Sequence, residues 1–399
     1  MNRPEKIPST SHPHLASRLE GIEPFHVVVL INRAKELEAQ GRSIANMVVG
    51  EPDAPTPPLI AAAGIRAIEG GRISYTSSLG MAELRDLIAA WYHTRYGVEV
   101  PRSRVIVTAG SSGALLLTMG ALLSPGDQVL MADPGYPCNR HFVRTMEGEA
   151  VGIPVGADTA YQLTAAMVEK HWTAKTAAVL IASPSNPTGT LIDHAELERI
   201  HAVVRARGGV LIVDEIYHGL TYGKRDRSAL EFADDLFIIN SFSKYFGMTG
   251  WRLGWMIAPE QYVAPIDKLA QNLFISPSDL AQRAALAAFE PDTVALLETR
   301  RDAFRAQRDF LLPELRNLGF DIPVTPEGAF YIYANCERLT DDSYKFCWDL
   351  LEKAGVAIAP GLDFGANKAK QHVRFSYPKS IPVLADGVER LKTYLRKKT

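Results

Sequence analysis

The sequence has few cysteines, and those that it has are far apart. The positions of Cys138, Cys336 and Cys347 suit neither a disulfide framework nor a zinc site, so we expect reduced thiols and no metal. No apolar run approaches the roughly 18 residues that a membrane-spanning helix needs. The polar N-terminus also lacks the apolar segment of a signal peptide. The sequence therefore predicts a soluble cytoplasmic protein that does not bind a membrane.

The chain also has no excess of charge of either sign. Its 399 residues contain 43 Lys+Arg and 45 Asp+Glu, for a formal net charge of −2. A balanced charge gives no attraction to nucleic acid, so we do not expect nucleic acid as a partner. A hydrophobic content of 47% with 22% charged residues is typical of a folded globular chain. The length allows a large domain with a smaller one.

Apolar segments and amphipathic segments alternate along most of the chain. Segments such as VLIVD and FIIN are apolar on both faces, which is typical of parallel strands covered by helices. Strands, with the turns that follow them, are predicted from Met47 and at 104–110, 128–137, 177–190, 209–219, 236–244 and 251–259. Helices are predicted at 25–40, 59–69, 81–96, 114–123 and 195–207.

After Pro277 the pattern changes to long helical stretches with short strands between them. We predict helical segments at 280–318 and 343–354, and strands at 330–335, 356–361 and 373–378. The fold class is therefore α/β, with a large α/β/α domain over 49–290 and a smaller α+β domain over 291–399. Residues 1–48 would form an N-terminal arm and part of the smaller domain.

Polar residues follow several strands where the chain turns. In TAGSSGALLL, Gly110, Ser111 and Ser112 precede an apolar helix, whose free N–H groups suit an anion such as phosphate. An ordinary N-cap is the alternative. Asp214 ends the strand VLIVD, so its carboxylate needs either a structural salt bridge or a ligand cation. Because open α/β sheets bind ligands at the carboxyl ends of their strands, this edge is the expected site.

Further polar and aromatic residues stand at the same edge. Tyr217 follows Asp214 by three residues and either reaches the same ligand or packs as a core aromatic. Asn186, before Pro187, either projects its amide into the site or forms a plain turn. Tyr136, in DPGYP, either stacks on a flat ring or packs in the core.

The segment SFSKYFGMTGWRLGW, residues 241–255, places Ser243, Lys244 and Arg252 among aromatics and glycines. A lysine in a dry environment has a lowered pKa and becomes a nucleophilic amine, although a surface lysine is the alternative. An aldehyde needs such an amine, a pyridine nitrogen needs a carboxylate, and a phosphate needs donors. Together these residues match the requirements of the cofactor pyridoxal 5′-phosphate.

The sequence resembles the class I/II pyridoxal-phosphate-dependent aminotransferases of fold type I. The resemblance extends from about Ser17 to the C-terminus, and its motifs occur in the order of the family. They are GEPDAPTPP, TAGSSGAL, DPGYP, SNPTGT, VDEIYHGL, SFSKYFGMTGWRLGW, PEGAFYIY and VRFSYP. The resemblance implies a fold-type-I architecture and a transaminase activity.

The resemblance also implies a role for each motif residue toward the cofactor. Lys244 would form the Schiff base and later move a proton, and Asp214 would keep the pyridine nitrogen protonated. Asn186 and Tyr217 would bond the phenolic oxygen and lower the pKa of the Schiff base. Tyr136 would stack on the ring. The phosphate would be held by Ser111, Ser112, Ser243 and Arg252.

Other motif residues are implied to hold the substrate. Arg374, in VRFSYP, would bind the substrate α-carboxylate through both ends of its guanidinium, assisted by the Gly50 backbone and Asn186. Tyr75 would reach the phosphate of a neighbouring subunit. The resemblance therefore implies a homodimer with its sites at the subunit interface.

The implied reaction is a ping-pong transfer of an amino group between an L-amino acid and a 2-oxo acid. One aspartate-using subgroup has a lysine where this chain has Ser112. Its absence favours neutral or aromatic donors such as alanine, with 2-oxoglutarate or pyruvate as acceptor. Aspartate stays an alternative if Arg18 or Arg33 replaces that lysine.

Other reactions and roles use the same cofactor and fold. A C–S lyase or a cyclopropane-forming synthase would start from the same loss of the Cα proton, so the fold does not distinguish them. A regulatory protein that binds the cofactor without turnover is a third class. The complete set of chemical residues argues against that class.

Overall fold

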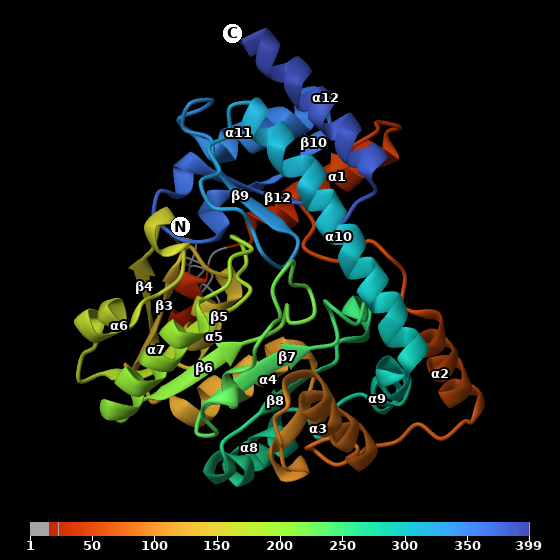
Figure 1. The fold of residues 1–399 in the computed structure, drawn as a ribbon, viewed down its shortest axis with the longest axis vertical. Helices are drawn as coiled ribbons and strands as arrows, with labels where there is room; N and C mark the ends of the chain where they lie inside the picture. Colours follow the sequence, from red (N-terminus) through yellow and green to blue (C-terminus); the bar gives the residue numbers. More distant parts are fainter. Residues whose placement is uncertain (1–15, 23, 399) are drawn as a thin grey trace, which may run out of the picture.

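The computed structural model describes residues 16–22 and 24–398, and its centre is a seven-stranded sheet (Figure 1). The N-terminal arm expected over the first dozen residues lies outside the described residues. The strands β7, β6, β5, β3 and β4 are parallel, whereas β8 is antiparallel to both β2 and β7. This arrangement confirms the mostly parallel sheet. In spatial order the strands are β2 (Val105–Thr108), β8 (Gly254–Ile257), β7 (Phe237–Ser241), β6 (Val210–Asp214), β5 (Thr176–Ala182), β3 (Gln128–Asp133) and β4 (Glu149–Pro154).

Helices cover both faces of this sheet, as the apolar strands predict. On β6, Leu211 and Val213 belong to one core, which also contains side chains of α3, α6 and α7. Ile212 between them belongs to the core on the opposite face, with α4, α5 and α8. The bounds of these helices are α3 (Ala82–Tyr96), α4 (Gly110–Leu122), α5 (Pro137–Thr145), α6 (Ala165–His171), α7 (His194–Ala206) and α8 (Glu260–Leu273).

A smaller antiparallel sheet lies above the large one in Figure 1, in the order β11 (Ala359–Pro360), β12 (His372–Ser376), β9 (Tyr331–Asn335). The N-terminal segment joins this part, because β1 (Ala45–Asn46) pairs with β10 (Val356–Ala357). The domain boundaries at 48/49 and 290/291 stay a prediction. The remaining helices are α1 (His26–Ala39), α2 (Pro58–Glu69), α9 (Asp279–Ala285), α10 (Pro291–Asn317), α11 (Ser343–Asp349) and α12 (Ile381–Lys398).

Some predicted elements differ in the structure. The strand expected from Met47 lies earlier, at β1. The Met47 N–H still donates to the Ala357 carbonyl, and the Met47 carbonyl accepts from the Ser376 N–H, before residues 48–50 continue as irregular chain toward Pro52. The strand expected from Trp251 begins at Gly254, because residues 249–251 form a 3₁₀ turn. The helix expected over 280–318 is interrupted, since Pro291 has no N–H and starts α10 as a new helix. No helix within 16–22 and 24–398 is long and apolar enough to cross a membrane.

Candidate active site

A cavity of about 260 Å³ opens at the carboxyl edge of the large sheet. It brings together predicted site residues that are far apart in the sequence. The predicted residues that line it are Gly50, Ser111, Ser112, Tyr136, Asn186, Asp214, Tyr217, Ser243, Lys244, Arg252 and Arg374. Tyr75 does not line it and is 80% exposed, so its contact with a neighbouring subunit stays a prediction.

Lys244 lies just beyond the end of β7. Its Nζ donates a hydrogen bond to the carbonyl of Gly50 at 2.7 Å. The same Nζ lies 5.8 Å from the ring centroids of Tyr217 and of Phe330. Burial, with the nearby charge of Arg374, lowers the pKa of Lys244 to about 8. Near neutral pH the neutral amine, which nucleophilic attack on a carbonyl requires, is therefore far more populated than in an exposed lysine, while the protonated form still predominates.

Asp214 ends β6 with a buried carboxylate. Its Oδ1 accepts a hydrogen bond from the N–H of Ile216 at 3.0 Å, and the described residues form no ion pair with it. Burial raises the pKa of Asp214 to about 7, against the lowering effect of the Ile216 bond. A cation bound beside this carboxylate would stabilise its ionised form. The position therefore suits a protonated ring nitrogen.

The predicted phosphate site lies where the start of α4 meets the loop before β8. Ser111 and Ser112 are in the first turn of α4, and no side chain within residues 16–22 and 24–398 caps this end. A Cβ at Gly254 would stand 2.8 Å from the Ser111 nitrogen, and one at Gly110 would stand 2.9 Å from Arg252 Nη2. Glycine at both positions thus leaves the N–H groups and the guanidinium open to an anion.

Arg374 reaches the cavity from β12 and is 2% exposed. Its Nη1 donates to Asn186 Oδ1 at 2.9 Å, and its Nη2 donates to the Val48 carbonyl at 2.8 Å. Its Nε has no hydrogen-bond partner among the described residues. The guanidinium lies 4.4 Å from the ring centroid of Tyr331 and 4.9 Å from that of Phe364. A buried guanidinium without a carboxylate is suited to bind one from a ligand.

Among the parts of the cavity wall that were not predicted from the sequence, two contribute a large aromatic ring and exposed apolar surface. One is Tyr331, which lies inside the motif PEGAFYIY. The other is the start of α1, where Val28 lines the cavity although it is 46% exposed. The Asp363 carboxylate accepts the N–H groups of His26 and Val27, each at 2.8 Å, and fixes this end of the helix. The sequence places Val28 and Ile31 on the apolar stripe of the predicted helix, which does not distinguish a residue that faces a cavity from one that packs in the core.

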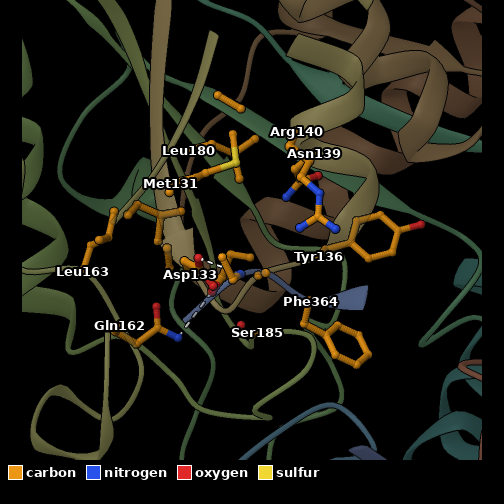
Figure 2. Close-up of a pocket in the computed structure, with 18 of the residues that line it drawn as sticks. Met131, Asp133, Tyr136, Asn139, Arg140, Gln162, Leu163, Leu180, Ser185 and Phe364 are labelled. Carbon is orange, nitrogen blue, oxygen red and sulfur yellow. Dashed lines mark hydrogen bonds between the residues drawn. The ribbon is translucent and has the colours of Figure 1, made fainter. Parts of the chain in front are cut away.

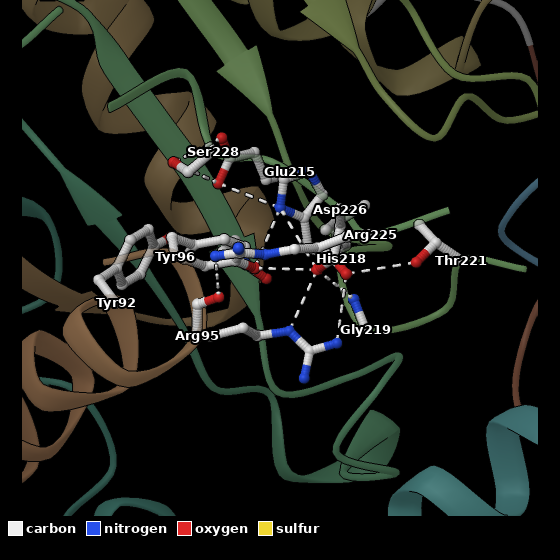
Figure 3. A network of polar contacts seen from close by, with 12 residues as sticks. Tyr92, Arg95, Tyr96, Glu215, His218, Gly219, Thr221, Arg225, Asp226 and Ser228 are labelled. Atoms are coloured by element: carbon white, nitrogen blue, oxygen red, sulfur yellow. Dashed lines mark hydrogen bonds and ion pairs between the residues drawn. The ribbon is translucent and has the colours of Figure 1, made fainter. Parts of the chain in front are cut away.

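A buried polar network stabilises the turn after β6 (Figure 3). The Glu215 carboxylate is fully buried and accepts a hydrogen bond from Ser228 Oγ at 2.9 Å. Asp226 pairs with Arg95 at 3.1 Å and accepts the N–H of Gly219 at 3.1 Å. These contacts hold the backbone on both sides of Tyr217, and so fix where its hydroxyl can reach.

A second cavity, of about 520 Å³, adjoins the first and shares Tyr136 with it (Figure 2). Its wall is largely apolar and includes Met131, Leu180 and Phe364. The Asp133 carboxylate in this wall is already occupied by backbone N–H groups. Lys244 and the predicted phosphate-binding residues Ser111, Ser112 and Arg252 line the first cavity and not the second, so the first cavity is the candidate active site.

Comparison with known proteins decides the family. The family model of class I and II aminotransferases matches residues 42–391. The chain belongs to this family. It is 38% identical over 377 residues to a valine–pyruvate aminotransferase from Mycobacterium tuberculosis, which covers 94% of this chain and 97% of the relative.

Other aminotransferases show similar agreement. A (5-formylfuran-3-yl)methyl phosphate transaminase from Methanocaldococcus jannaschii is 36% identical over 96% of this chain and 100% of its own. A crystal structure of an aminotransferase from Mycobacterium tuberculosis matches with a TM-score of 0.93 at 38% identity, covering 97% and 100% of the two chains. The expected fold type I and aminotransferase activity are thereby confirmed.

Aminotransferases of this family depend on pyridoxal 5′-phosphate, and the cavity fits that cofactor. Lys244 offers an amine with a pKa of about 8, and Asp214 offers a buried carboxylate that forms no ion pair with the part of the chain that the structure describes. The uncapped start of α4, beside Arg252, offers donors for a phosphate. Each group of the cofactor thus has a matching residue in this chain.

Proposed function

We propose that this aminotransferase takes its amino group from a neutral L-amino acid and passes it to pyruvate or 2-oxoglutarate. The observation that carries the proposal is the composition of the cavity wall. Its cations are Lys244, Arg252 and Arg374, which serve the cofactor and the substrate α-carboxylate. Val28 and Ile31 of α1 contribute apolar surface, which suits a donor side chain such as that of alanine, valine or an aromatic residue.

The arginines that could replace the missing lysine are occupied elsewhere. Arg33 Nε lies 2.6 Å from Glu352, and Arg18 Nη2 lies 3.4 Å from Glu147. Neither arginine lines the cavity. A distal carboxylate such as that of aspartate would therefore enter without a charged partner among the described residues, which costs free energy. The apolar donor of the valine–pyruvate relative supports the same choice.

Different residues of the cavity perform different parts of the proposed reaction. When bound, pyridoxal 5′-phosphate carries the amino group and accepts electrons from the substrate carbon. Lys244 attaches the cofactor and, once released, moves a proton. Asp214 keeps the ring nitrogen protonated, while Tyr217 and Asn186 bond the ring oxygen. Arg374 orients the substrate through its α-carboxylate.

The donor is tested by following the absorbance of the bound cofactor while single L-amino acids are added without an oxo acid. Alanine or valine should convert the cofactor at least about tenfold faster than aspartate, and pyruvate should restore the spectrum. Faster conversion by aspartate would contradict the neutral-donor proposal. Release of pyruvate and ammonia from a cysteine conjugate, without conversion, would favour the lyase alternative.

Changing Arg374 to lysine should mainly weaken substrate binding. Lysine keeps the charge but loses the planar fork, so we expect the KM for the amino acid to rise about 100-fold with a smaller change in kcat. Steady-state kinetics over a range of amino-acid concentrations measures both constants. Arg199→Lys, on the exposed face of α7, is the matched control. An unchanged KM would refute the carboxylate role of Arg374.

A further inference from the structure

Tyr331 lies among the polar groups of the cavity, in contact with Tyr217, Gly50 and Arg374. It begins β9 opposite Ser376 of β12, so Arg374, two residues along β12, is its diagonal neighbour on the same face. This register brings the Tyr331 ring to 4.4 Å from the Arg374 guanidinium. Tyr331 is 1% exposed and lines the cavity. Its position is therefore fixed by both sheet pairing and burial.

The hydroxyl of Tyr331 has two neighbouring acceptors. It lies 2.8 Å from the Tyr217 hydroxyl oxygen and 3.4 Å from the carbonyl oxygen of Gly50. The Gly50 carbonyl already accepts a bond from Lys244 Nζ at 2.7 Å. A separation of 3.4 Å is long for an O–H···O bond, so donation across 2.8 Å to Tyr217 is the stronger of the two bonds open to the Tyr331 proton. The Tyr217 hydroxyl can then donate its single proton to another acceptor.

Both hydroxyls keep their protons at neutral pH, because burial raises the pKa of Tyr217 and of Tyr331. The charged groups that act on the Tyr331 hydroxyl are Arg374, which lowers its pKa, and Glu51, which raises it. Donation in a chain strengthens each bond through polarisation. A chain from Tyr331 through Tyr217 to a ligand oxygen would therefore make Tyr217 a better donor.

We propose that Tyr331 is a positioning residue with two separable parts. Its hydroxyl directs the proton of Tyr217 toward the ring oxygen of the cofactor, and its aromatic ring supports the Arg374 guanidinium that receives the substrate carboxylate. The first part rests on the proposed role of Tyr217. The second part rests on the contact between the ring and the guanidinium, which is favourable in a desolvated site.

The two parts are tested with two variants of the cofactor-loaded enzyme. Tyr331→Phe keeps the ring and removes the hydroxyl, so the pH midpoint of the cofactor's absorbance change, measured without substrate, should rise by about one unit. Its KM for the amino acid should stay within about twofold. Tyr331→Leu also removes the ring, so its KM should rise about tenfold further.

Matched variants keep the outcomes distinct. Tyr333→Phe removes a buried hydroxyl from the same strand that has no hydrogen-bond partner among the described residues, and it should leave the midpoint unchanged. Tyr217→Phe should raise the midpoint at least as much as Tyr331→Phe. A shift with Tyr217→Phe but none with Tyr331→Phe would overturn the hydroxyl part while leaving the role of Tyr217 intact. No shift with either variant would overturn both.

The ring part has its own contrary outcome. An equal KM for Tyr331→Phe and Tyr331→Leu would overturn it, provided that both proteins retain the cofactor. Thermal unfolding and cofactor content identify a leucine variant that has failed to fold. In that event the Tyr331→Trp variant replaces the leucine variant, because tryptophan keeps an aromatic face and lacks the hydroxyl oxygen. A KM above that of the phenylalanine variant would then contradict the proposal that the ring supports Arg374.

Discussion

Replacing Lys244 by alanine should abolish turnover, with kcat falling by more than about 10⁴-fold. The substitution would remove the amine that we propose both attaches the cofactor and moves a proton during the reaction. The Lys244 side chain donates to the Gly50 carbonyl and otherwise contacts aromatic rings, so its loss leaves the strand framework intact. We therefore expect a folded protein that binds the cofactor weakly and without a covalent bond.

Steady-state kinetics, circular dichroism and gel filtration with the cofactor measure these three properties of the Lys244→Ala variant. Lys268→Ala, at an exposed position on α8, is the control and should behave as the unmodified enzyme. A small primary amine added to the alanine variant should restore part of the rate, because it replaces the missing base. Normal turnover without added amine would show that Lys244 is not the reacting lysine.

The second large effect is expected at Asp214. Asparagine has nearly the same shape and still accepts the N–H of Ile216, but it has no negative charge. Without that charge the ring nitrogen of the cofactor is held protonated less well, so kcat should fall about 10³-fold. The same exchange at the exposed Asp341 should have no effect on kcat. A kcat within tenfold of that of the unmodified enzyme would contradict the proposed role of Asp214.

The pH dependence of cofactor binding gives a second measure of Asp214. Burial raises the pKa of Asp214 to about 7 in the cofactor-free cavity, so the carboxylate gains a proton as the pH falls below that value. Attraction to a protonated ring nitrogen is present above this pKa and weakens below it. The affinity of the cofactor-free enzyme for the cofactor should therefore decrease from pH 8 to pH 6. The decrease should be steeper than in the Asp214→Asn variant, and fluorescence titration measures both affinities.

Candidate site residues that follow the carboxyl end of a strand could be predicted from the sequence. Asp214 and Lys244 follow apolar strands, and parallel strands place their carboxyl ends at one edge. The roles themselves came from the family resemblance, since each residue alone had an ordinary structural alternative. The structure adds that these side chains share one cavity.

The remaining features depend on contacts between distant segments. Tyr331 looks like one more core aromatic, and only the register of β9 against β12 brings it to Arg374. The strand β4, with six residues, and the helix α5, with nine, were not predicted, because segments this short span too few repeats of their period to be distinguished from a loop. The direction of β8 was also open, since strand polarity depends on the connection and not on composition.

The cavity wall proposed to select the substrate and the residues proposed to perform the chemistry come from different parts of the chain. Val28 and Ile31 belong to α1, whose first turn is fixed by Asp363, whereas Lys244 and Asp214 follow strands of the large sheet. Variation within one helix of 14 residues can therefore change which amino acid is accepted without altering the reaction. An evolving lineage, or a designed library restricted to α1, could explore new donors while inheriting the same catalyst.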